Sequence, residues 1–139
     1  MNKPRLDTLK VLLVDDENLV RHLIKSVLRL AGVREIYEAD SVEAAWDILN
    51  CRDVHLILSD IGMEPKSGID FVLALRQNEK ARIKRLPFIF LTAKDDQDTV
   101  STAIRSGANA YILKNNLSPA TLTARLNSVL TRPGVEHRS

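Results

Sequence analysis

The residues best suited to chemistry in this chain are acids, a hydroxyl and a lysine that follow short apolar runs. Asp60 ends the run Leu56–Ser59 and precedes a loop that contains glycine and proline. A short apolar run bounded by turn residues is typical of a buried strand. A carboxylate at the end of such a strand is costly to desolvate unless another group pairs with it. Asp60 therefore needs partners from elsewhere in the chain.

Four polar residues stand at the ends of other apolar runs: Asp15, Asp16, Thr92 and Lys114. In a parallel sheet the carboxyl ends of the strands meet at one edge, so we expect these side chains near Asp60. Three carboxylates within about 4 Å repel by about 4 kcal/mol per pair at an effective dielectric near 20, so they need a cation. Oxygen ligands without histidine or cysteine favour Mg²⁺. Such acids beside a lysine and a hydroxyl are typical of a site for a transferring phosphoryl group.

The elements that must position these residues alternate between strand and helix patterns. The predicted strands are residues 11–14, 36–39, 56–59, 88–91 and 110–113. Each is followed by apolar residues at helical spacing, which predicts five helices over Leu19 to Ala31, Val42 to Leu49, Ile69 to Leu73, Val100 to Ile104 and Leu122 to Leu130. Leu73 and Ile104 are expected on the inner faces of their helices. This alternation predicts a parallel sheet with helices on both faces.

The composition sets the class of protein. With 139 residues, 45% hydrophobic and 27% charged, the chain can bury one core without disulfides or a structural metal. Cys51 is the single cysteine, so no intramolecular disulfide is possible and a reducing compartment is expected. No apolar stretch is long enough to span a bilayer. These features predict a cytoplasmic protein with an extension over 1–8, one domain over 9–131 and a flexible tail over 132–139.

One stretch concentrates positive charge in a chain whose net charge is only +2. Its basic residues are Arg76, Lys80, Arg82, Lys84 and Arg85. The two interpretations are a patch for nucleic acid or another partner, and a solvated helix end. No aromatic residues interleave to stack on bases, which favours the solvated helix end and no nucleic-acid partner.

The motifs together resemble a response-regulator receiver domain of the CheY type over about residues 9 to 131. The matching segments are Leu13–Glu17, Asp60 to Met63 with Gly68 eight residues after the aspartate, Leu91–Ala93, and Gly107–Lys114. Each motif alone is weak, but the four occur in order and each stands at a predicted strand end. The resemblance implies a flavodoxin-like, doubly wound sheet of five parallel strands in the order 2-1-3-4-5, with five helices.

The resemblance also implies the roles of the acids. Asp60 would be the nucleophile that accepts a phosphoryl group from a histidine kinase or a histidine phosphotransfer protein. Asp16 and Asp60 would bind Mg²⁺ directly, Asp15 mainly through water, and Gly62 through its backbone carbonyl. A carboxylate nucleophile forms an acyl phosphate, which hydrolyses readily and suits a transient signal.

Read-out of the phosphoryl group is implied for three further residues. Lys114 would bind one phosphoryl oxygen, Thr92 would move to bind another, and Tyr111 would report the switch. The downstream protein would bind the face formed by the fourth helix, fifth strand and fifth helix. This family uses the same face for dimers, so a homodimer is left open.

Two features depart from the usual receiver pattern or vary within it. Lys114 is usually followed by proline in a cis peptide, whereas Asn115 follows here. A non-proline cis bond costs about 2.5–4 kcal/mol, so this peptide is expected to be trans or a strained cis bond. Gly62 and Lys94 occupy positions near the phosphoryl group that influence the dephosphorylation rate in this family. We expect them to tune the lifetime of the phosphorylated state.

The favoured interpretation is a single-domain response regulator that is not a turnover enzyme and signals by binding another protein. One alternative is a phosphatase or phosphotransferase with an aspartyl intermediate. Such enzymes typically carry a second acid two residues after the nucleophile, where this chain has Gly62. The others are a receiver-like interaction module that is never phosphorylated, and a receiver fragment of a longer regulator with a separate output domain.

Overall fold

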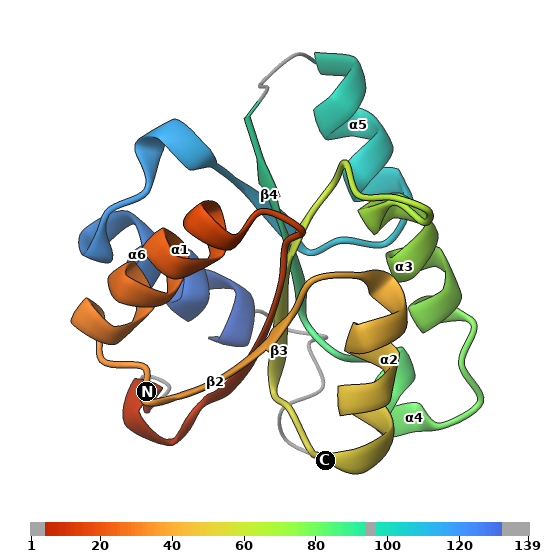
Figure 1. Ribbon diagram of the computed structural model, residues 1–139, viewed down its shortest axis with the longest axis horizontal. Coiled ribbons are helices and arrows are strands. Elements are labelled where there is room, and N and C mark those ends of the chain that lie inside the picture. The colour runs from red at the N-terminus through yellow and green to blue at the C-terminus, as the bar shows by residue number, and fades with distance from the viewer. Residues whose placement is uncertain (1–4, 94–96, 132–139) are drawn as a thin grey trace.

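A parallel sheet of five strands in the order β2-β1-β3-β4-β5 runs through the middle of the protein (Figure 1). The computed structural model describes residues 5–93 and 97–131. The strands are β1 (Lys10–Val14), β2 (Glu35–Ala39), β3 (Leu56–Asp60), β4 (Phe88–Thr92) and β5 (Ala110–Leu113). The helices are α1 (Asn18–Leu30), α2 (Val42–Cys51), α3 (Gly68–Arg76), α4 (Ala81–Lys84), α5 (Gln97–Arg105) and α6 (Pro119–Thr131). Short 3-10 helices form at Leu6–Thr8 and Lys114–Asn116. The strand order predicted from the sequence is confirmed.

The three central strands are buried on both faces, which explains their continuous apolar runs. Leu12 and Leu13 point to opposite faces of β1, and both are completely buried. Every residue of β4 is buried as well, including Thr92 at its end. The edge strands β2 and β5 include partly exposed residues. The apolar runs therefore mark the centre of the sheet, where the carboxyl ends of β1, β3 and β4 lie side by side.

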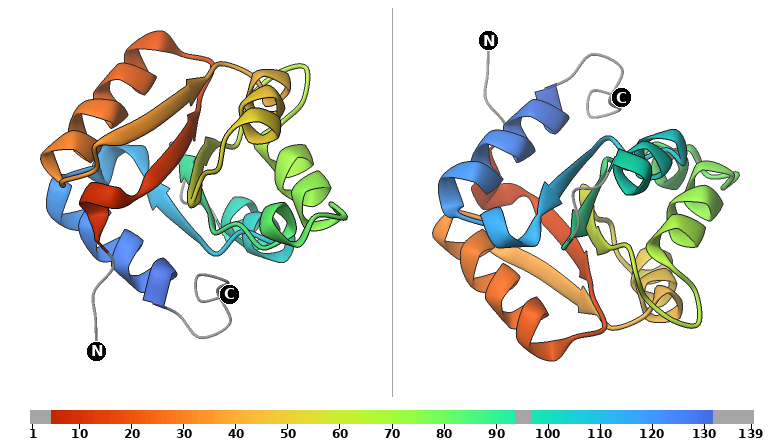
Figure 2. Two further views of the ribbon diagram at one scale, coloured as in Figure 1. Left: turned by 90° about the horizontal axis from the view of Figure 1, so that it is seen from below. Right: turned by 90° about the horizontal axis from the view of Figure 1, so that it is seen from above.

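The helices form one layer on each face of the sheet. Helices α1 and α6 cover one face, and α2, α3, α4 and α5 cover the other (Figures 1 and 2). The first core contains Ile24, Leu28, Leu122 and Leu126 packed on the sheet, and the second contains Val42, Leu49, Phe71 and Leu75. None of the described helices is long and apolar enough to cross a membrane.

The described residues form six α-helices instead of the five predicted from the sequence. The third predicted helix ends at Arg76, and a separate short helix, α4, follows. Between them, the Asn78 side chain accepts a hydrogen bond from the backbone N–H of Lys80 at 2.9 Å. This local bond competes with continued helix. Helix α4 then buries Ile83 in the core.

Helical spacing located the helices but did not identify all of their buried residues. Leu73 of α3 and Ile104 of α5 were expected to face inward, yet both are exposed, by 43% and 44%. On α1, Leu19 and Leu23 belong to the apolar pattern and are also exposed. The apolar arc of each helix is wider than the strip that the sheet covers, so residues at its margin meet solvent.

Arg76 has a structural role that its place in the basic run did not predict. Its guanidinium donates hydrogen bonds to the carbonyls of Gly107, Leu86 and Lys84 at 2.9, 2.7 and 2.8 Å, and to the Asn109 side chain at 3.1 Å. Burial lowers the pKa of this arginine. The solvated-surface interpretation is therefore wrong for Arg76, which ties α3 to the segments that enter β4 and β5. The other four basic residues of the run are exposed, as expected.

Candidate functional site

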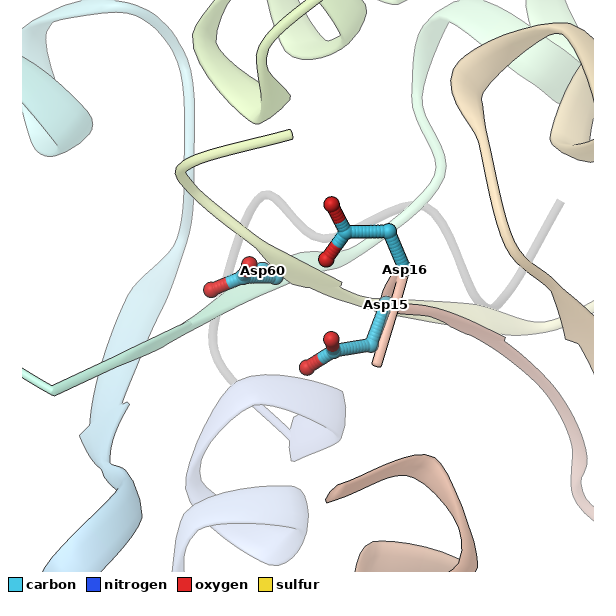
Figure 3. A group of neighbouring side chains, drawn as sticks. All are labelled: Asp15, Asp16 and Asp60. Atoms are coloured by element: carbon cyan, nitrogen blue, oxygen red, sulfur yellow. The ribbon is translucent and has the colours of Figure 1, made fainter. Parts of the chain in front are cut away.

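The acids predicted to converge lie together at the carboxyl edge of the sheet. β3 ends on Asp60, and β1 ends one residue before Asp15. The pairing of Val14 with Ser59 brings the two strand ends to the same level. One carboxylate oxygen from each of Asp15, Asp16 and Asp60 lies within 4.8 Å of the others. The three side chains lie next to one another around the ends of β1 and β3 (Figure 3).

Lys114 completes this cluster, which we call the acidic pocket (Asp15, Asp16, Asp60 and Lys114). Its Nζ atom lies 3.0 Å from Asp15 Oδ2 and 3.1 Å from Asp60 Oδ1. Burial raises the pKa of Asp60, and the nearby ammonium of Lys114 offsets only part of that rise. Burial alone would lower the pKa of Lys114, but its hydrogen bonds and charge interactions with Asp15 and Asp60 outweigh burial and raise it. Lys114 is therefore held as a cation between two carboxylates.

The acidic pocket fits a divalent cation. Three carboxylates and one ammonium leave an excess of negative charge. Asp15 is completely buried, and its Oδ2 atom has no hydrogen-bond donor among the described residues beyond the ion pair with Lys114. Asp16 is exposed, so one side of the cluster opens to water. Clustered carboxylates with room for water are the environment that Mg²⁺ prefers.

Comparison with known proteins decides the family. The response regulator receiver domain family matches residues 11–127, which is most of the chain. The chain belongs to this family. The fold is accordingly flavodoxin-like, as the strand order indicates.

Relatives of this receiver domain include chemotaxis proteins. CheY1 of Helicobacter pylori is 32% identical over 123 residues, covering 88% of this chain and 97% of that protein. CheY of Pseudomonas aeruginosa is 34% identical over 106 residues, covering 76% and 84%. The structure of Vibrio cholerae CheY4 superposes with a TM-score of 0.78 at 29% identity, covering 88% and 98%. The chain is thus a single receiver domain of the CheY type, and receiver domains are signalling proteins rather than classical turnover enzymes.

The predicted read-out residues of the receiver lie on the two strands beyond Asp60. Asp60 pairs with Leu91, so Thr92 stands one residue further along β4, buried at the same edge. Tyr111 of β5 is half-buried and packs against the core on the α2, α3 and α5 side of the sheet. The structure therefore brings Thr92 to the edge that carries the acidic pocket and places Tyr111 within the neighbouring strand. Their roles in switching stay predictions.

The loop after Asp60 contains the predicted ligand Gly62. Gly62 is exposed, whereas the neighbouring Met63 is buried in the core and anchors the loop. Lys94, the other predicted rate-tuning residue, lies outside the described residues. Among described residues the only cis peptide joins Glu64 to Pro65, so the peptide after Lys114 is trans.

Gly68 connects the receiver's acidic pocket to helix α3. Its N–H donates to the carbonyl of Ile61 at 2.7 Å. A Cβ atom at this position would overlap the Asp60 carbonyl oxygen and come within 2.8 Å of the Phe90 ring. Only glycine allows this close approach, because any side chain would displace backbone or a buried aromatic ring.

Gly68→Ala is therefore expected to lower the free energy of unfolding by about 1–3 kcal/mol, as overpacking does. Urea unfolding measures the change. Gly62→Ala is the matched control, because nothing lies within 4 Å of a Cβ there, and its stability should be unaltered. Equal stability of Gly68→Ala and the wild-type protein would contradict the close approach.

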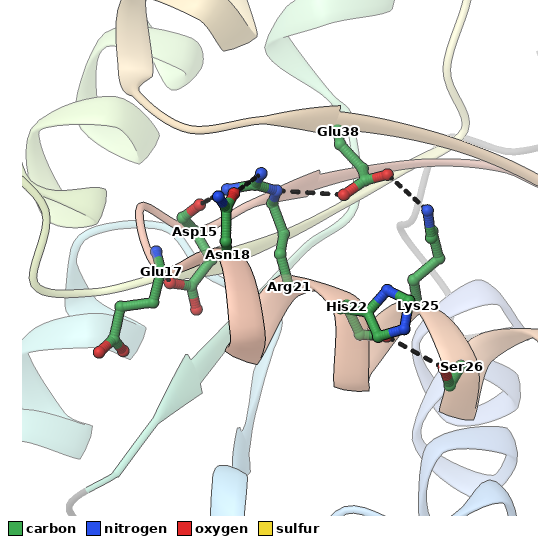
Figure 4. Close-up of polar contacts among 8 residues, drawn as sticks. All are labelled: Asp15, Glu17, Asn18, Arg21, His22, Lys25, Ser26 and Glu38. Atoms are coloured by element: carbon green, nitrogen blue, oxygen red, sulfur yellow. Dashed lines mark hydrogen bonds and ion pairs between the residues drawn. The ribbon is translucent and has the colours of Figure 1, made fainter.

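Sequence reasoning missed one polar network beside the acidic pocket. Arg21 of α1 contacts the backbone of Asp15 and the side chain of Glu38 on β2 (Figure 4). Glu38 is 17 residues away from Arg21 and belongs to another element. No local pattern links the two residues, so only the tertiary structure could reveal the contact.

Proposed function

We propose that this receiver accepts a phosphoryl group on Asp60 from the phosphohistidine of a histidine kinase or histidine phosphotransfer protein. The observation that carries the proposal is the contact of Lys114 Nζ with both Asp60 Oδ1 and Asp15 Oδ2 inside a cluster of three acids. This arrangement supplies a carboxylate nucleophile, a cation for phosphoryl oxygens and ligands for Mg²⁺.

The proposed transfer balances without any further reactant. A carboxylate oxygen of Asp60 attacks phosphorus, the bond from phosphorus to the donor imidazole nitrogen breaks, and the electron pair leaves with the imidazole. Asp15, Asp16, Asp60 and the carbonyl of Gly62 would hold Mg²⁺, which neutralises charge on the phosphoryl oxygens when bound. Hydrolysis later breaks the bond between phosphorus and the Asp60 oxygen and returns the carboxylate.

Read-out would begin when the phosphoryl oxygens draw Lys114 and Thr92 to themselves. Two charge-assisted hydrogen bonds at about 1.5–3 kcal/mol each come near the roughly 5.5 kcal/mol that reverses a 1:99 equilibrium. Tyr111 would transmit the change to a downstream protein bound on the face of α5, β5 and α6. These elements are the fourth helix, fifth strand and fifth helix predicted from the sequence. The protein would work in the cytoplasm, which its single cysteine favours.

The test is incubation with Mg²⁺ and acetyl phosphate followed by intact mass measurement. The wild-type protein should gain one phosphate adduct that EDTA prevents. The adduct should survive in Asp53→Asn, because Asp53 is an exposed acid away from the pocket with a side chain 80% exposed. No adduct in the wild type would favour the unphosphorylated interaction module, and steady release of phosphate would favour a phosphatase.

The lifetime of the adduct is expected to depend on Gly62 and Lys94. Gly62→Asn should shorten it several-fold, because the added amide can hold a water beside the phosphoryl group where glycine leaves open space. Lys94→Glu should change it as well, because the receiver resemblance assigns this position an influence on the dephosphorylation rate and the substitution reverses its charge. The measurement is the decay of the adduct by intact mass after removal of acetyl phosphate. Gly62→Ala is the control, and unchanged decay in both Gly62→Asn and Lys94→Glu would reject the tuning role.

A further inference from the structure

Arg21, near the start of α1, donates hydrogen bonds to three different segments beside the acidic pocket. Its Nη1 donates to the backbone carbonyl of Asp15 at 2.7 Å, and its Nε donates to Glu38 Oε1 at 3.1 Å. Its Nη2 donates to the Asn18 side chain. The Arg21 side chain is only 15% exposed. A nearly buried guanidinium that bridges a loop, a helix and a strand is unlike a solvated surface arginine.

The contact with Asp15 reaches the connection between the two acids that follow β1. The Asp15 carbonyl belongs to the planar peptide unit that joins Asp15 to Asp16. Holding that oxygen fixes the rotation of the peptide plane, and with it the directions in which both carboxylates leave the backbone. The Asp15 side chain is held as well, because its Oδ1 accepts the N–H of Glu17 at 3.0 Å.

The far end of Arg21 is anchored on the neighbouring strand. Glu38 of β2 pairs in register with Leu13 of β1, and its second oxygen accepts a hydrogen bond from Lys25 at 2.9 Å. The hydrogen bond from Lys25, together with that from Arg21, lowers the pKa of Glu38 and outweighs the opposing effect of burial, so this anchor is a carboxylate at neutral pH. Arg21 thus links the β1–α1 loop to β2 through Glu38, whose position is held by Lys25.

We propose that Arg21 is a positioning residue for the divalent cation, which orients the Asp15 and Asp16 carboxylates through the peptide that joins them. The inference rests on the proposed magnesium binding of the acidic pocket. In this role the Arg21 guanidinium does not contact the cation or the carboxylates that bind it. It acts through the backbone of Asp15.

Charge and positioning predict opposite effects when Arg21 is removed. Loss of a positive charge near three carboxylates would by itself strengthen Mg²⁺ binding. Loss of the link lets the Asp15–Asp16 peptide rotate, so the ligands are no longer prearranged and Mg²⁺ binding weakens. Residues that orient metal ligands typically contribute 10- to 100-fold in affinity. The direction of the change therefore identifies the role.

The experiment is calorimetric titration of the phosphate-free protein with MgCl₂. Arg21→Met should weaken Mg²⁺ binding about tenfold. The matched control is Lys25→Met, which removes a positive charge from the same helix and the same Glu38 without touching Asp15. Its affinity should be unchanged or slightly higher. Binding by Arg21→Met as tight as or tighter than wild type would overturn the inference.

A second variant covers the case in which Arg21→Met does not fold, which thermal unfolding would show. Arg21→Lys keeps the charge, but a single ammonium lacks the fork needed to span the Asp15 carbonyl and Glu38 together. It should also bind Mg²⁺ more weakly, and wild-type affinity would overturn the inference. Absence of Mg²⁺ binding in the wild-type protein would be a different result, because it would refute the proposed magnesium site itself.

Discussion

Asp60→Asn is expected to be more stable than the wild-type protein at neutral pH without Mg²⁺, while losing the phosphate adduct completely. The amide keeps the shape of the carboxylate but cannot form an acyl phosphate. It also removes one of three clustered negative charges, of which Lys114 balances only part. The gain in free energy of unfolding should be about 1–2 kcal/mol, a size common when a substitution relieves a functional site. Urea unfolding of both proteins in EDTA measures it.

The pH dependence of this difference follows from the raised pKa of Asp60. Burial raises the pKa above the ordinary value of 3.8, so the folded protein holds this proton to higher pH than the unfolded chain. The folded protein therefore loses stability, relative to the unfolded chain, as the pH rises from the ordinary pKa through the raised pKa of Asp60. The stability advantage of Asp60→Asn over the wild-type protein should shrink as the pH falls from neutral toward the ordinary pKa of an aspartate. An advantage that grew on acidification would contradict this explanation.

Magnesium should reverse the order of stability. The cation stabilises the folded wild-type protein by mass action, whereas Asp60→Asn has lost one ligand. Asp53→Asn, a substitution of an exposed acid, should change neither the stability nor the adduct. A wild-type protein that gains no stability from Mg²⁺ would contradict the assignment of the acidic pocket.

Lys114→Met is expected to lower the free energy of unfolding by about 3 kcal/mol in EDTA. Removing one partner of a buried ion pair leaves the other charge uncompensated, and such losses reach about 3–5 kcal/mol. Here Asp15 is completely buried and the Asp60 side chain is 14% exposed, so both carboxylates lose a cation that solvent replaces poorly. Saturating Mg²⁺ should recover part of the loss. Lys84→Met, a substitution of an exposed lysine, is the control.

The double variant Lys114→Met with Asp60→Asn tests whether the two residues interact. Removing the Asp60 charge leaves less repulsion for Lys114 to offset, so the second substitution should restore part of the stability lost in Lys114→Met. Residues in contact commonly show interaction energies of about 0.5–3 kcal/mol in such cycles. Strict additivity would mean that the ion pair contributes nothing to the stability of the fold.

The centre of the sheet and the composition of the acidic pocket could be predicted from the sequence. A central parallel strand is buried on both faces, so it appears as an uninterrupted apolar run whose end is easy to locate. Asp15, Asp60 and Thr92 stand at such ends, and parallel topology brings those ends to one edge. The contacts of Lys114 with two of the acids confirm the predicted convergence.

Only the tertiary structure decided which long polar side chains make structural contacts. It also decided which apolar residues at the margin of a helix face are buried. Arg21 and Arg76 both donate to backbone carbonyls, yet neither position differs in local pattern from an exposed arginine. Leu19 and Leu73 share the helical spacing of the core but are exposed. Periodicity reports the relation of a residue to its own helix or strand. Burial at the margin of a helix, and the reach of a guanidinium to another strand, depend on how the elements pack against one another.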